Sequence, residues 1–274
     1  MLECDQRVRP FPHARTFFWP APRVLVLGLL VLGLAGCVYL PRATQRPVPT
    51  IGSQGKGSPA ASTLVVFLPG RWDRMDAYER HGFIAEMARA GVRADWLSVD
   101  AHPGYYRERS VVDRLHEDVL VPARARGYRR IVIVGISLGG LGALLSERDQ
   151  PGKVDALVLI APYLGQNKRL LAEIAATGGP AAWAVGHTPV EGVFETDLWT
   201  FLGKKNASLP PTWLAWGDKD SFAESHRLLA PLLPSDRLFT QPGAHDWETW
   251  QALWQQLCER SDLFADEKKA ARLP

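Results

Sequence analysis

Cysteine is scarce in this sequence. The 274 residues include three cysteines, Cys4, Cys37 and Cys258, and no two of them have a paired spacing. Disulfide-dense proteins and cysteine-based zinc sites both need several cysteines at short, regular intervals. The sequence therefore predicts neither a disulfide framework nor a cysteine zinc site. Cys258 is predicted to be a small buried residue of a C-terminal helix.

Basic clusters are also lacking. The formal net charge is +3, and residues 1–36 hold four arginines against Glu3 and Asp5, so the remainder carries +1. No run of Lys and Arg is interleaved with aromatic residues, as a nucleic-acid surface requires. We therefore expect no nucleic-acid partner.

No apolar run is long enough to cross a bilayer comfortably. Residues 24–35 are uncharged and apolar and follow Arg15 and Arg23, which is typical of a secretory signal. The run ends in Leu34-Ala35-Gly36-Cys37, which resembles the lipobox of bacterial lipoproteins. The resemblance implies cleavage before Cys37 and a diacylglyceryl group on its sulfur. An uncleaved signal anchor is the alternative.

Residues 38–62 are rich in Pro, Gly and Ser and have no apolar periodicity. We predict a signal peptide over 1–36, a tether over 37–62 and a folded domain over 63–274. Val38, rather than an aspartate, follows Cys37. Resemblance to Gram-negative lipoproteins then implies an anchor in the outer membrane, facing the periplasm.

Short apolar runs alternate with helical patterns through the folded part. Such alternation predicts an α/β fold, with a mostly parallel sheet and helices on both faces. Residues 164–208 break the alternation, and we predict a short helical lid insertion there, over the carboxyl ends of the strands. Its aromatic residues would either face an apolar part of a substrate or close the insertion's own core. They are Trp183, Phe194, Trp199 and Phe201. The predicted strands are 63–68, 94–99, 130–134, 154–160, 212–216 and 236–240.

The segment Gly135-Ile136-Ser137-Leu138-Gly139 lies between a β-branched run and a stretch of small residues. This pattern predicts a sharp turn from strand to helix that exposes the serine hydroxyl. The glycines would allow the strained backbone and the close helix that such a turn requires. Ser137 is therefore the candidate nucleophile.

A serine hydroxyl needs a base, and the base needs an orienting acid. Asp218 and Asp220 follow a late strand and His245 follows the last one, so their side chains would meet Ser137 at the carboxyl edge of the sheet. The order Ser, Asp, His along the chain suits this architecture. His102 would border the same cleft. The other histidines, His81, His116, His187 and His226, are predicted to be surface or packing residues.

With these three motifs, residues 63–260 resemble an α/β-hydrolase. The resemblance implies Ser137 as nucleophile, His245 as base and Asp220 as acid, with Asp218 shaping the turn. It also implies oxyanion donors at the N–H of Leu138 and in the loop Pro69-Gly70-Arg71-Trp72, from Arg71 or Trp72. That loop departs from the family's His-Gly pattern, because Pro69 replaces the histidine. The Arg71 side chain could instead bind a substrate anion or form a salt bridge.

These observations predict a serine hydrolase that cleaves a small-molecule carboxylic ester or thioester through an acyl-enzyme. The enzyme would be lipid-anchored in the cell envelope, without a metal or organic cofactor. Two alternatives remain open, an acyltransferase with the same three side chains and a non-catalytic binding lipoprotein. Dehalogenase chemistry is disfavoured, because the elbow carries serine rather than aspartate.

Overall fold

The structure is a computed structural model that describes residues 42–53, 61–205, 209–260 and 262–270. The predicted signal peptide, Cys37 and the first residues of the predicted tether lie outside the described residues. Among the helices that the structure describes, none combines the length and the apolar character needed to cross a bilayer.

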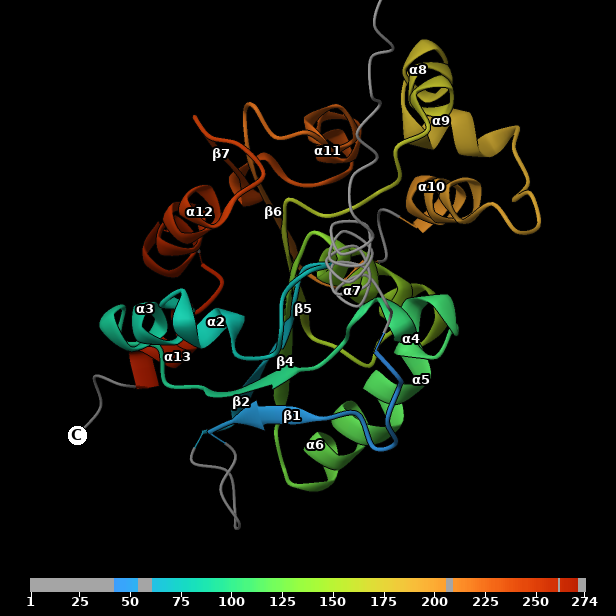
Figure 1. The fold of residues 1–274 in the computed structure, drawn as a ribbon. Coiled ribbons are helices and arrows are strands. Elements are labelled where there is room, and N and C mark those ends of the chain that lie inside the picture. The colour runs from blue at the N-terminus through green and yellow to red at the C-terminus, as the bar shows by residue number, and fades with distance from the viewer. Residues whose placement is uncertain (1–41, 54–60, 206–208, 261, 271–274) are drawn as a thin grey trace, which may run out of the picture. The chain divides into compact units, whose positions relative to one another are not determined.

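A seven-stranded sheet forms the centre of the fold, in the order β1-β3-β2-β4-β5-β6-β7 (Figure 1). Strand β1 pairs with β3 in the antiparallel direction, and all other neighbours are parallel. This confirms the predicted mostly parallel α/β sheet. The strands are β1 (Thr50–Gly52), β2 (Thr63–Leu68), β3 (Asp95–Val99), β4 (Arg130–Ile136), β5 (Ala156–Ile160), β6 (Thr212–Gly217) and β7 (Leu238–Gln241).

The central strands are buried on both faces, which explains their continuous apolar sequence. Alternate residues point to opposite faces. In β2, Leu64 and Val66 enter one hydrophobic cluster, whereas Val65 and Phe67 enter the other. Two separate layers of helices are needed to cover these faces.

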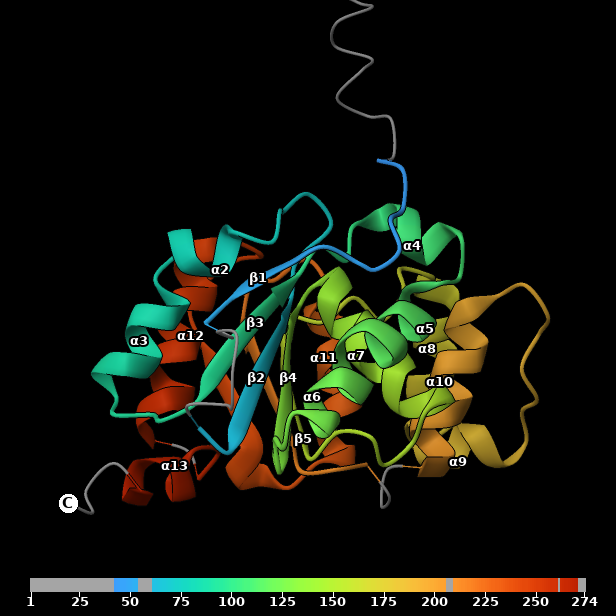
Figure 2. The same ribbon diagram turned by 90° about the horizontal axis from the view of Figure 1, so that it is seen from below.

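One layer contains α2 (Ala77–Arg80), α3 (Phe83–Arg89), α12 (Trp247–Arg260) and α13 (Ala265–Ala270) (Figure 2). The other face is covered by α4 (Pro103–Arg107), α5 (Val111–Leu115), a π-helical segment (His116–Leu120), α6 (Val121–Ala125), α7 (Leu138–Asp149) and α11 (Ala223–Leu229), together with the helices between β5 and β6. Helix α7 follows β4 directly along the chain and packs against it.

The prediction of a tether over residues 37–62 is wrong in part, because residues 42–53 pack on the folded domain. Thr50 to Gly52 pair with Leu97 to Val99 as an edge strand. Ahead of them, Arg42 forms a salt bridge of 2.8 Å with Asp100, and the Val48 N–H donates to Asp118. A three-residue strand is too short to show a hydrophobic period, so the composition of the segment concealed it.

Three helices lie between β5 and β6, where the alternation was predicted to break. They are α8 (Lys168–Ala176), α9 (Pro180–Val185) and α10 (Phe194–Lys205). Trp183 and Trp199 are buried at 2% and 0% exposure and belong to the main hydrophobic cluster. These two tryptophans therefore close the core and do not face a substrate, whereas Phe194 is 37% exposed.

Candidate active site

Ser137 occupies a strained turn between β4 and α7. Its φ of 52° and ψ of −113° lie in a region that non-glycine residues rarely adopt. Two backbone hydrogen bonds hold the turn, from the Ser137 N–H to the Ile160 carbonyl at 3.0 Å and from the Tyr163 N–H to the Ser137 carbonyl at 2.8 Å. The end of β5 therefore fixes the serine in place.

Gly135 and Gly139, on either side of Ser137, are required for steric reasons. A Cβ on Gly135 would overlap the carbonyl of Gly139, and a Cβ on Gly139 would overlap the carbonyl of Leu68 at the end of β2. Both obstacles are backbone atoms, which cannot rotate away as a flexible side chain could. Only glycine lets α7 start this close to the strands.

The structure brings Ser137, His245 and Asp220 together. His245 Nε2 lies 3.0 Å from Ser137 Oγ, and His245 Nδ1 lies 2.8 Å from Asp220 Oδ2. The three side chains come from the carboxyl ends of β4, β6 and β7. A carboxylate can only accept, so Nδ1 carries the proton and Nε2 is left to accept from the serine hydroxyl.

Asp220 and Asp218 have different partners. The Asp220 side chain is fully buried, and its Oδ1 accepts a hydrogen bond from the Phe222 N–H at 2.8 Å. Asp218 Oδ1 instead accepts from the Gly243 N–H at 3.0 Å, two residues before His245. Asp218 therefore fixes the loop that carries His245, whereas Asp220 contacts the imidazole itself.

Aromatic rings hold the His245 imidazole from two sides. The rings of Phe222 and Trp250 approach it edge to face at 4.8 and 4.9 Å between centroids. No pattern in the sequence predicts these contacts, although Phe222 is only two residues from Asp220. The sequence also does not predict the role of Tyr78. Its buried hydroxyl donates a hydrogen bond to the Leu68 carbonyl at 2.6 Å and accepts one from the Ile136 N–H at 3.2 Å.

Two candidate oxyanion donors lie beside the serine. Leu138 is the first residue of α7, where N–H groups have no carbonyl partner within the helix. The loop after β2 also passes close to Ser137, since a Cβ on Gly70 would be 3.8 Å from Ser137 Cβ. The Arg71 guanidinium packs over the Trp72 ring at 4.7 Å, and Trp72 is 68% exposed.

His102 does not join the site. It is buried, and its Nδ1 accepts from the Gly104 N–H at the start of α4. His81 stacks on Trp247, and His187 Nε2 lies 2.9 Å from Glu173 Oε1. In the part of the chain that the structure describes, no group of three or more His, Cys, Asp and Glu side chains is placed to hold a metal ion.

His226 is completely buried near Asp220. Its Nε2 donates to the carbonyl of Pro162 at 2.9 Å, and Nδ1 has no hydrogen-bond partner. Burial lowers the pKa of His226 to about 4, so the ring is neutral at physiological pH. The hydrogen bond links α11 to the loop after β5 that supports Ser137.

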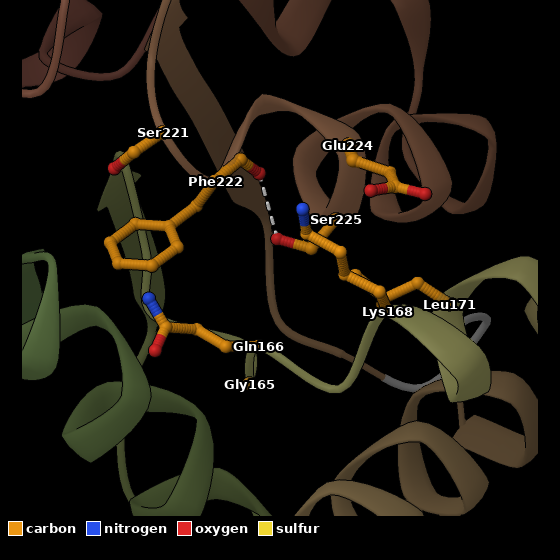
Figure 3. A pocket seen from close by; sticks show the side chains of 8 residues that line it. All are labelled: Gly165, Gln166, Lys168, Leu171, Ser221, Phe222, Glu224 and Ser225. Carbon is orange, nitrogen blue, oxygen red and sulfur yellow. Dashed lines mark hydrogen bonds between the residues drawn. The ribbon is translucent and has the colours of Figure 1, made fainter.

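Two cavities lie near these residues. The larger one, of about 740 Å³, has an apolar wall that includes Leu141, Leu145 and Phe194. Tyr163, which also lines it, binds the Ser137 carbonyl through its N–H. A smaller cavity of about 310 Å³ lies between α8 and α11 (Figure 3). Phe222 lines this second cavity and contacts both Tyr163 and His245.

Comparison with known proteins supplies the family context. A family model described as "Alpha/beta hydrolase family" matches residues 65–273. No curated protein matches the chain in sequence.

Solved structures resemble the fold at low sequence identity. A ferulic acid esterase is 16% identical, with a TM-score of 0.51, and the alignment covers 76% of this chain and 87% of the other. Est1E from Butyrivibrio proteoclasticus is 18% identical, with a TM-score of 0.51 and coverage of 79% and 90%. The peroxisomal alpha-beta-hydrolase Lpx1 from Saccharomyces cerevisiae is 12% identical, with a TM-score of 0.50 and coverage of 83% and 91%.

The buried state of His226 predicts a pH dependence of stability. Because its folded pKa of about 4 lies below its ordinary value of 6.5, the native state binds fewer protons than the unfolded state between these values. The unfolding free energy should fall as the pH drops through this window, by about 2 kcal/mol between about pH 7 and about pH 5. His226→Gln removes the titrating group and retains a donor for Pro162, so its stability should fall less over the same interval.

Urea unfolding of both proteins at the two pH values measures this difference, since the remaining titratable groups cancel in the comparison. Parallel losses of stability in the two proteins would show that His226 does not titrate in this window.

Proposed function

The chain belongs to the alpha/beta hydrolase family, and on this premise we propose that it is a serine hydrolase that cleaves a carboxylic ester or thioester. The observation that carries the proposal is the continuous hydrogen-bonded series from Ser137 through His245 to Asp220, with distances of 3.0 and 2.8 Å. Such a series activates a hydroxyl that is a poor nucleophile alone.

In the proposed acylation step, Ser137 Oγ attacks the carbonyl carbon while His245 Nε2 takes the hydroxyl proton. Asp220 stabilises the resulting imidazolium through Nδ1–H. His245 then returns the proton to the leaving alcohol or thiol as the bond to the carbonyl carbon breaks. An acyl group remains on Ser137, and water, deprotonated by His245, hydrolyses it in the second half of the reaction.

The developing oxyanion needs hydrogen-bond donors on the side away from His245. We assign them to the N–H groups of Leu138 and Arg71. Leu138 is supported by its place at the start of α7, where the helix dipole also favours negative charge. Arg71 is supported by its position directly after Gly70, which lies beside Ser137.

We assign the acyl group to the larger cavity. Two residues that line this cavity lie close to Ser137 in the structure, since Leu141 follows it by about one helical turn and the Tyr163 N–H binds its carbonyl. A volume of about 740 Å³ is within the usual range for a small-molecule site. Residues 189–193 of the insertion close one side, which supports the predicted lid role.

Anchoring through a lipid on Cys37 in the cell envelope is part of the proposal. Its support is the sequence alone, namely the apolar run over residues 24–35 and the lipobox-like Leu34-Ala35-Gly36-Cys37. When the full chain is expressed in a Gram-negative bacterium, the first peptide of the mature protein should begin at a diacylglyceryl-modified Cys37. Mass spectrometry of the membrane fraction checks this, and a peptide that still contains residues 24–36 would exclude cleavage.

The hydrolase proposal is tested with a series of p-nitrophenyl esters of increasing acyl length. Turnover should peak at one chain length, and Ser137→Ala should reduce it by on the order of 10⁶. Ser146→Ala is a matched control, because Ser146 is a buried serine within α7 and lies outside the hydrogen-bonded series. It should retain turnover within about threefold. Equal activity of the wild type and Ser137→Ala would refute the proposal.

A further inference from the structure

Asp73 lies in the loop between β2 and α2, the same loop that carries one proposed oxyanion donor. Its N–H donates to the Gly70 carbonyl at 3.2 Å and closes the loop into a turn. Its carboxylate folds back over the same glycine, since a Cβ on Gly70 would lie 2.7 Å from Asp73 Oδ2. The backbone amide of Gly70 also forms a hydrogen bond with the carboxylate. Asp73 thus contacts the loop from both its backbone and its side chain.

The other carboxylate oxygen reaches a different element. Asp73 Oδ1 accepts a hydrogen bond from Trp247 Nε1 at 3.2 Å. Trp247 begins α12 and lies two residues after His245. One side chain therefore joins the loop beside the proposed oxyanion site to the helix that follows the proposed base.

The indole of Trp247 is itself held firmly. It stacks on His81 with 4.0 Å between centroids and a 4° interplanar angle, and it meets the edges of Tyr78 and Phe83. Trp250 packs against Trp247 on one side and against His245 on the other. The N–H that Asp73 binds therefore has a fixed position relative to the imidazole.

Burying the Asp73 carboxylate costs desolvation free energy. Desolvation raises the pKa of its carboxyl group, and the hydrogen bonds from Trp247 and Gly70, with the nearby His81 and Arg80, oppose that effect. Among the described residues, no cationic side chain lies within salt-bridge distance of this carboxylate. A partly buried carboxylate that lacks an ion-pair partner costs desolvation free energy, and its hydrogen bonds must offset that cost.

We propose that Asp73 is a positioning residue for the reaction, which tethers the loop of residues 69–73 to Trp247 and so holds the Arg71 N–H at the oxyanion. The inference rests on the proposed hydrolase function. A displacement of about 1 Å in such a donor costs on the order of 100-fold in rate.

The test compares Asp73→Ala, Asp73→Asn and Trp247→Phe with the wild type. Asp73→Ala removes both arms of the tether, Asp73→Asn retains an acceptor for the indole, and Trp247→Phe retains the aromatic packing without the N–H. Asp73→Ala and Trp247→Phe should lower kcat by about 10- to 100-fold with KM changed less than about threefold, because a transition-state interaction is lost. Asp73→Asn should fall between Asp73→Ala and the wild type.

Two variants serve as matched controls. Trp254→Phe removes another indole hydrogen bond of α12, from Trp254 Nε1 to the Phe83 carbonyl, that lies away from the loop. Glu79→Ala removes an exposed carboxylate on α2. Both should keep kcat within about threefold after correction for the folded fraction by circular dichroism.

The rate of fluorophosphonate labelling at Ser137 separates the two proposals. A wild-type protein that is not labelled would overturn the hydrolase function. Wild-type labelling together with an unchanged labelling rate and kcat in folded Asp73→Ala or Trp247→Phe would overturn the positioning role and leave the hydrolase function intact. Slower labelling in both variants and normal labelling in both controls is the expected result.

Discussion

The positive φ of Ser137 is the constraint on which the site depends. A non-glycine residue held at 52° must be forced there by its surroundings, at a cost of roughly 1–3 kcal/mol. The carbonyl of Ile160 and the N–H of Tyr163 bind the turn from β5, while Gly135 and Gly139 let α7 pack without side chains in the way. The backbone contacts that hold this strained turn come from the end of β5 and the loop after it, and α7 packs against the end of β2, so the position of the serine hydroxyl depends on the strands on both sides of β4.

Parallel topology then supplies the remaining groups. The carboxyl ends of β2, β4, β6 and β7 open at one edge of the sheet, so the loops after them meet around the serine. Their mutual positions are fixed by a few polar contacts, such as Asp218 with the Gly243 N–H and Asp73 with the Trp247 indole. Each contact ties one loop to the next, which is how separate strands yield distances of about 3 Å between functional groups.

Much of the fold and of the candidate site could be predicted from local patterns in the sequence. The fold class followed from alternating apolar runs, and the elbow followed from the spacing of its glycines around Ser137. Chain order left both Asp218 and Asp220 open, and the resemblance to the family favoured Asp220. Asp220 is the one that contacts His245, and the chemical roles of both residues stay a proposal. Features that depend on contacts between distant residues could not be found. The three-residue strand β1 and the Asp73 tether have no local periodicity, because each exists only once the chain has folded.

In the proposed reaction, Ser137 becomes covalently acylated. Mixing the protein with a p-nitrophenyl ester, quenching in acid within the first turnover and mapping peptides by mass spectrometry observes that intermediate directly. We expect one acyl group on the protein, located on Ser137 in the peptide that spans the end of β4 and the start of α7. Rapid release of p-nitrophenol without any acylated peptide, or an acyl group on another residue, would contradict it.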